Sequence, residues 1–436
     1  MGFLRKNTLL IGILCSSFNT LMDSTPVSAM SLDDFIEQAI AQDPVLQQLD
    51  NKHQGYRHQA DAATYFNDPT LSLDVMNVPV ETGSLNQEAM TQLKVGVAQP
   101  LPRGDSLAIQ SRIYTQQSDE QQRLRWLRQA EIQRIVSLIW LDGVLAQQTI
   151  EIVEKNQQLF EQLSDIANAN YTSGFGATKQ DDLIRTQVEL LQLEDRLLME
   201  STALARTQSR LQEWVTEVNA HQIAFQLDTV EALFPHQWID TGLHQEVVFD
   251  VLRRHPKVRV IDKRVDIAEQ RVALADQAFK PQWTLRGSYA LRNDNDMASR
   301  SDFFSVGVSV DFPFGGDKQS ALRAASVANA EAVKTDVHLA MRQLLSEAES
   351  ARQNYLKYSQ RIALYETRLL KQVTEQADST MTAYTSDDGE FKEVVRANVA
   401  ELNTQITLLM LRIEQAKALV NLNYFLSHAE TSSKSE

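Results

Sequence analysis

Two stretches decide the fold of this chain: WTLRGSYAL at residues 283–291 and FFSVGVSVDF at residues 303–312. In both, apolar residues alternate with small or polar residues. A period of two over about ten residues is typical of a strand with one apolar and one polar face. Because the two runs are separated by a polar loop at 293–302, the segment 282–314 is predicted to be a β-hairpin.

The same pattern occurs in the first half of the chain, as TLSLDVM at residues 70–76 and LKVGVA at 93–98. It predicts a second hairpin at 70–101. A shift of 212 residues brings Pro44 onto Pro256 and Pro69 onto Pro281, so punctuating residues repeat in one register. Self-similarity over so long a stretch indicates an internal duplication.

We therefore predict two copies of one unit, at residues 30–217 and 243–426, joined by a linker at 218–242 and followed by a flexible tail at 427–436. Each copy is expected to contain a helical segment, a hairpin and a long helical hairpin. The first helical segment is expected to start near Ser31, a capping residue, and to end before Asp68-Pro69.

Chain breakers are scarce after each hairpin. No proline occurs between Pro102 and Pro235, and Gly143 is the only glycine between Gly104 and Gly174. Such a run permits a helix of roughly 60 residues or more, about 100 Å long at 1.5 Å per residue. Short turns between the long helices predict antiparallel neighbours. The last helix carries a 4-3 apolar alternation typical of a coiled-coil seam: Val395, Val399, Leu402, Ile406, Leu409, Ile413, Ala416 and Val420.

The N-terminus has the pattern of a secretory signal at residues 1–29. Arg5 and Lys6 precede the apolar segment 9–14, and small residues at 27–29 form a cleavage site. The one cysteine, Cys15, lies inside this segment. A lipid-anchored cysteine usually follows a small residue, whereas Leu14 precedes Cys15, so we expect an exported protein with neither lipid anchor nor disulfides.

The composition excludes several classes of protein. The chain has 42 Lys and Arg against 57 Asp and Glu, a net charge of −15, so nucleic-acid binding through phosphate contacts is not expected. With 43% hydrophobic residues and one cysteine, the chain is neither a disordered low-complexity protein nor a disulfide scaffold. No run of about 18 apolar residues follows the N-terminus, so no helical membrane span is predicted.

The four predicted strands have the length that crosses a bilayer at a tilt. Four strands cannot close a barrel, and an open strand edge is not tolerated in lipid. Two chains would supply eight strands, whose interior side chains would fill, whereas three chains supply twelve. A trimer fits the polar residues of the strands better, since they resemble a pore lining: Ser72, Asp74, Lys94, Thr284, Arg286 and Ser309.

Aromatic residues near the strand ends resemble the girdles of membrane barrels: Trp283, Tyr289, Phe303, Phe304, Phe312 and Phe314. The fold class predicted is mainly α with a membrane β-barrel contribution, in which four strands per chain close as a twelve-stranded barrel in a trimer. The alternative is that both hairpins fold onto the helices of a soluble periplasmic coiled-coil protein with a structural or adaptor role.

The chain resembles the TolC-like outer-membrane factor family in its signal peptide, its duplicated units and the Tyr-x-x-Gly turn at 171–174. The resemblance covers residues 31–427. It implies a homotrimeric channel-tunnel in outer-membrane lipid with a large periplasmic portion. It also implies two partners, a periplasmic adaptor (membrane fusion) protein and a proton-driven inner-membrane pump, and passive export with no enzymatic activity and no cofactor.

Three segments are similar to the heavy-metal efflux branch of this family: 67–71, 99–104 and 182–185. That branch usually has Gly-Lys-Arg where this chain has Gly104-Asp105-Ser106. The similarity implies that the exported substrates are heavy-metal cations and that the protein confers metal resistance. The alternatives are the outer-membrane component of a drug-efflux system or of a type I protein-secretion system.

The resemblance also places a gate at the periplasmic entrance, formed by the turns between the long helices. By motif position its residues are Tyr171, Asp181, Asp182 and Arg185 in the first copy, and Tyr384, Asp387 and Asp388 in the second. Rings of carboxylates favour cations in channels, and Arg185 could pair with Asp182 at i+3. The alternative is that acids after a turn only favour the helix N-terminus.

No metal or catalytic site is predicted. His53 and His58 are five residues apart, which does not place two ligands on one helical face. Asp294 and Asp296 lie in the loop between the second pair of strands, where a solvated turn is the simpler interpretation. No nucleophile–base constellation or phosphate-binding loop is present in the sequence, so we expect no enzyme.

Overall fold

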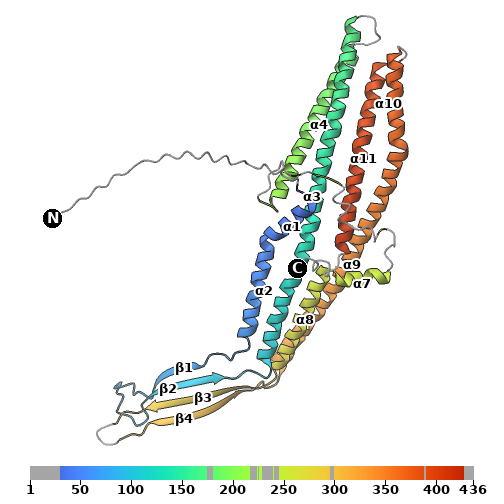
Figure 1. Cartoon of the computed structure of the whole chain (residues 1–436). Helices are drawn as coiled ribbons and strands as arrows, with labels where there is room; N and C mark the ends of the chain where they lie inside the picture. The colour runs from blue at the N-terminus through green and yellow to red at the C-terminus, as the bar shows by residue number, and fades with distance from the viewer. Residues whose placement is uncertain are drawn as a thin grey trace, which may run out of the picture.

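The structure is a computed structural model and describes residues 30–173, 180–216, 223, 225–227, 239, 245–294, 299–386 and 389–426. The predicted signal segment, the tail and most of the linker at 218–242 lie outside these residues. The molecule is elongated, with four strands at one end and the tips of the long helices at the other (Figure 1).

The first half of the chain contains α1 (Leu32–Gln42), α2 (Pro44–Ala62), β1 (Thr70–Met76), β2 (Gln92–Pro100), α3 (Ser106–Ser173) and α4 (Gln180–Gln212). The second half contains α7 (Gln245–Arg254), α8 (Pro256–Gln277), β3 (Gln282–Leu291), β4 (Phe303–Asp311), α9 (Asp317–Leu364), the π-helix η2 (Tyr365–Leu369), α10 (Leu370–Thr385) and α11 (Phe391–Phe425). The same order of elements therefore occurs twice.

The helical segment predicted before the first hairpin consists of two helices, α1 and α2. Ser31 starts α1 with a capping box that involves Asp34, as its hydroxyl suggests. The helix ends at Gln42, and Pro44 then opens α2 at a position where the missing N–H costs nothing. The side chain of Asp43 caps α2 by accepting from the Leu46 N–H at 2.9 Å. The second half is broken in the same way before Pro256, the first residue of α8.

The very long helix predicted after the first hairpin is confirmed, since α3 spans 68 residues. It packs against α2 and α8 toward the sheet, and against α4 and α11 toward the tips. A window of α3 is apolar enough to cross a membrane by composition, but half of it is buried by these neighbours. Core helices pass the same test, so this window is explained by packing.

Most of the buried apolar residues among the described ones lie in two clusters that hold the helices together. The larger lies around Trp140 of α3, which is fully buried and whose ring centroid is 5.0 Å from that of Phe225 and 6.3 Å from that of Phe35. The smaller lies toward the tips and includes Phe160 and Phe391. The coiled-coil seam predicted in α11 is confirmed, because its residues are buried and Val399 is half-buried.

The strands form one antiparallel sheet in the order β1-β2-β3-β4, so the two copies share a sheet. Its register places apolar residues opposite one another across all four strands. One such row is Leu73, Val95, Tyr289 and Phe304, and the row beside it on the other face is Ser72, Gly96, Ser288 and Ser305. The predicted alternation is therefore confirmed, with one apolar and one polar face.

Candidate functional site

The tips of the long helices hold the residues of the predicted gate. Asp181 and Asp182 lie in the first turn of α4, and Arg185 lies exposed one turn further on. Tyr171 is exposed in the last turn of α3. Asp387 and Asp388 lie outside the described residues.

Tyr384 packs within the turn of the second copy. Its ring centroid lies 5.3 Å from that of Phe391, and it borders the buried cluster near the tips. A Cβ on Gly389 would lie only 2.7 Å from the Tyr384 backbone nitrogen, so the close turn needs glycine there. Tyr384 therefore packs against other residues that the structure describes. The sequence alone is compatible with either packing or gating for this residue.

The first turn of α11 brings further charges to the tip. Lys392 contacts Glu390, and this hydrogen bond is the main reason that the pKa of Lys392 is raised; the charges of Glu393 and Asp182 act in the same direction. Asp182 of α4 therefore lies within electrostatic reach of α11. Sequence reasoning missed Glu390, Lys392 and Glu393, although a charged first turn after a tip is a usable signal.

The polar face of the sheet carries few charges. Asp74 of β1 lies opposite Lys94 of β2, so opposite charges are cross-strand partners. Arg286 of β3 lies opposite Ala98 on one side and Gly307 on the other. The rest of this face is built largely from Ser, Thr, Gly and Ala, which leaves it small and hydrophilic.

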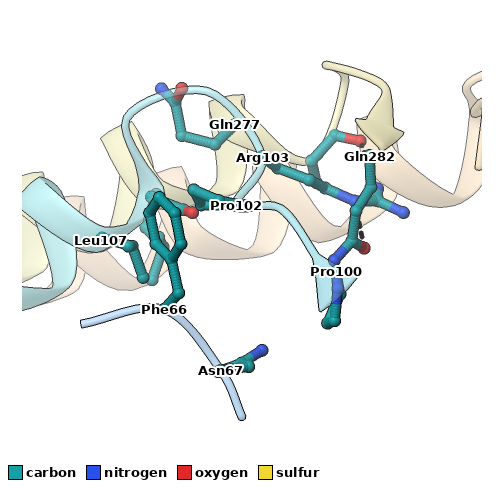
Figure 2. Close-up of a pocket in the computed structure, with 11 residues that line it drawn as sticks. Phe66, Asn67, Pro100, Pro102, Arg103, Leu107, Gln277 and Gln282 are labelled. Atoms are coloured by element: carbon teal, nitrogen blue, oxygen red, sulfur yellow. Dashed lines mark hydrogen bonds between the residues drawn. The ribbon is translucent and has the colours of Figure 1, made fainter. Parts of the chain in front are cut away.

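The junction between sheet and helices is held by Arg103, which follows β2. Its guanidinium donates to the Gln282 amide oxygen and to the Ala278 carbonyl, both at 3.2 Å, and contacts the Asp311 carboxylate. Figure 2 shows Arg103 extended toward Gln282, above Pro100. Arg103, Ala278 and Gln282 border a cavity of about 290 Å³. The segment 99–104 therefore clamps the end of β2 to the start of β3 and the end of β4.

The loops at the far end of the sheet contact one another. Asp294 accepts from the Arg300 N–H at 2.6 Å, which is the turn role expected for it, while Asp296 lies outside the described residues. Arg292 and Arg300 donate to the carbonyls of Ala89 and Glu88 at 3.3 and 2.7 Å, and so join the two hairpin loops.

His53 has a structural role. The Nδ1 atom of His53 lies 2.7 Å from the Ser118 hydroxyl, which links α2 to α3. No group of three or more His, Cys, Asp or Glu residues that could hold a metal ion occurs among the described residues.

No protein-family model matches the chain, and no curated protein matches it in sequence. Solved structures do match over nearly its whole length. VceC, an outer membrane protein of Vibrio cholerae, is 15% identical with a TM-score of 0.72, and the match covers 91% of this chain and 96% of VceC. MtrE, an outer membrane channel of Neisseria gonorrhoeae, is 14% identical with a TM-score of 0.73, covering 91% and 88%.

A third match is CusC, whose structures describe transmembrane channel formation; it is 15% identical with a TM-score of 0.72, covering 91% of this chain and 92% of CusC. The chain therefore has the fold of the TolC-type outer-membrane channels, which confirms the mainly helical fold with long helices and a four-stranded sheet. At this identity the likeness extends to the fold alone.

Proposed function

We propose that the chain is an outer-membrane channel that exports substrates passively, as the outer component of a tripartite efflux system. The observation that carries this proposal is the apolar face of the sheet, which nothing in the described chain covers. Leu71, Phe304 and Val306 are 73%, 73% and 74% exposed. Contiguous apolar surface of this extent is rare on soluble proteins and is typical of a membrane or partner contact.

The open edges of the sheet support a trimer. In the sheet that the structure describes, β1 and β4 each have one neighbouring strand. Their free N–H and C=O groups would be unsatisfied in lipid, so β4 of one chain must pair with β1 of the next chain. Three chains close a twelve-stranded barrel with a water-filled interior that suits the polar face.

The helices support assembly around a long duct. A row of apolar side chains on α4 is exposed at heptad-like spacing, namely Ile184, Val188, Leu191 and Leu198. Such a row needs a second helix to cover it. At 1.5 Å per residue, α3 alone is about 100 Å long, which suits a periplasmic tunnel that meets an adaptor and a proton-driven pump at its tips.

The similarity of segments 67–71, 99–104 and 182–185 to the heavy-metal branch favours metal cations as the substrate. A deletion strain should then lose growth on a panel of metal salts and not on a matched panel of drugs. Sensitivity to drugs alone, or loss of a secreted protein, would favour the drug-efflux or type I secretion alternatives.

The gate at the tips is proposed on Asp181 and Asp182, together with Tyr171, Arg185 and Tyr384. By motif position it also includes Asp387 and Asp388. In support, Asp182 lies in the first turn of α4 and acts on Lys392 of α11. If three copies bring these carboxylates into a ring, Asp181→Ala with Asp182→Ala should lower the cation selectivity of the channel. An unchanged selectivity would leave the acids with a helix-capping role only.

Fractionation tests the proposed function directly. The protein should be found in the outer membrane, run as a heat-modifiable trimer on gels, and conduct ions in planar lipid bilayers. A soluble periplasmic monomer would contradict the proposal and favour the structural or adaptor-like alternative.

A further inference from the structure

Arg286 carries the unbalanced charge on the polar face of the sheet. The three other charged residues in the strands of this face are matched: Asp74 lies opposite Lys94, and Asp311 contacts Arg103. Among the described residues, Arg286 makes no ion pair or hydrogen bond, and its side chain is exposed. Each chain therefore adds about one positive charge to the middle of this face.

The surroundings of Arg286 leave its guanidinium available. Its cross-strand partners, Ala98 and Gly307, are too small to cover it. On the same face of β3, Thr284 and Ser288 lie two residues to either side and present hydroxyl groups. Five N–H donors beside two hydroxyls make a surface that matches the oxygens of carboxylate, phosphate or sulfate groups.

The duplication makes this charge specific to the second copy. The shift of 212 residues that aligns the copies places Arg286 on Asp74, so the same strand position carries opposite charges. In the first copy, Lys94 on the adjacent strand offsets Asp74, whereas no such partner faces Arg286.

We infer that Arg286 is a selectivity-determining residue of the barrel lumen and favours oxyanion groups over cations there. This inference rests on the proposed function, because closure of the trimer places three guanidinium groups at one level of the lumen. Rings of Arg or Lys select anions in pores. The outer part of the channel would then oppose the cation preference proposed for the acidic tips. Metal cations, the substrate proposed above, would pass this level against the charge of Arg286, whereas substrates with carboxylate or phosphate groups would pass it more readily.

The test is the ratio of potassium to chloride permeability, taken from reversal potentials across a potassium chloride gradient in planar bilayers. Arg286→Gln should raise this ratio about threefold near 0.1 M salt, as expected when charges about 10 Å from the ion act through water. The shift should vanish near 1 M salt, where the Debye length is about 3 Å. Arg286→Lys should restore the wild-type ratio.

The matched control is the double variant Asp74→Asn with Lys94→Gln, which removes two charges from the same face without changing its net charge. It should leave the ratio unchanged. If the wild-type protein forms a channel, the inference is overturned when Arg286→Gln has the same permeability ratio as wild type, or when the control variant shifts the ratio equally. Either result leaves the proposed function standing. If the wild-type protein forms no channel, the proposed function fails first and the inference fails with it.

Discussion

Asp43 and His255 occupy matching positions in the two copies, 212 residues apart, and each caps a helix that opens with proline. The Asp43 carboxylate also accepts from the Arg128 guanidinium of α3 at 2.8 Å. The His255 ring accepts from the Lys257 N–H through Nδ1, so its Nε2 donates to the Tyr424 carbonyl of α11 at 3.1 Å. Both are buried, and both use their remaining polar atom to tie the helix break to a long helix.

Tyr424 gives a prediction for alkaline pH. Burial, helped by the charges of Glu131 and Glu347 and opposed by Arg134, raises the pKa of Tyr424 to about 12. The unfolded chain ionises this phenol near pH 10, so between about pH 10 and 12 the folded state holds a proton that the unfolded state has released. Folding stability contributed by the neutral phenol is therefore lost as pH rises through this window, by up to about 2 kcal/mol.

The measurement is the thermal midpoint of wild type and Tyr424→Phe in detergent, followed by circular dichroism at pH 9 and at pH 11.5. Phenylalanine keeps the ring that Arg134 stacks on, with the guanidinium carbon 4.5 Å from the ring centroid, but it cannot ionise. The midpoint of the variant should gain on that of wild type at the higher pH. A difference between the two proteins that does not change with pH would contradict the prediction.

Along α3, the one glycine is explained by a contact from outside the helix. A Cβ on Gly143 would overlap the ring of Phe225, a residue of the segment that connects the two copies. Gly143 thus lets that segment pack on the helix beside Trp140. Gly143→Ala should destabilise the protein by about 1–3 kcal/mol through overpacking, although alanine is the better helix former by about 1 kcal/mol.

Gly55 is the matched control, since it lies within α2 and a Cβ there would meet nothing within 4 Å. Gly55→Ala should therefore stabilise the protein by about 0.5–1 kcal/mol. Phe225→Leu should recover part of the loss when it is combined with Gly143→Ala. If both alanine variants raise the thermal midpoint, the contact with Phe225 does not decide the presence of Gly143.

The strands and the long helices could be predicted because each leaves a regular period in the sequence over ten residues or more. Features that depend on contacts between distant residues left no such signal. The break at Asp43 depends on whether Asp43 caps a new helix or continues the first one, and the sequence does not decide this. The role of Gly143 could not be predicted without the contact with Phe225. The π-helix η2 lies where Arg412 of α11 donates to Glu366 at 2.6 Å, a contact between residues far apart in the chain. The residues of the predicted gate could be placed near the tips from the sequence. The interaction of Lys392 with Asp182 could not be predicted, because it depends on how α4 and α11 lie next to each other.

For the whole assembly, the duplication predicts how one copy meets the next. Within a chain, β2 pairs with β3 so that Ala98 lies opposite Arg286. Asp74 lies opposite Lys94, and its match Arg286 lies opposite Gly307, so Lys94 matches Gly307 and Ala98 matches Asp311. If the contact between chains repeats the contact within a chain, Asp311 of one chain lies opposite Asp74 of its neighbour, and Ser309 lies opposite Met76.

Cysteine cross-linking checks this register. A chain with Met76→Cys and Ser309→Cys should form disulfides between chains and give a covalent trimer on non-reducing gels. Within one chain the two residues lie on opposite edges of the sheet, at least about 14 Å apart at 4.8 Å per strand, beyond the reach of a disulfide. The control is Met76→Cys with Ser305→Cys, four residues out of register on the same face. Efficient cross-linking of the control and not of the first pair would contradict the repeated register.

The shared sheet also bears on how this architecture could arise. β2 pairs with β3 across the boundary between the repeats. In the proposed trimer, each hairpin would therefore meet its neighbours through equivalent edges, whether the neighbour belongs to the same chain or to another. An ancestral chain with one unit would close the proposed ring as a hexamer. Fusing two units halves the number of strand contacts that must form between separate chains. It also lets matching positions of the two repeats differ in charge, as Asp74 and Arg286 do.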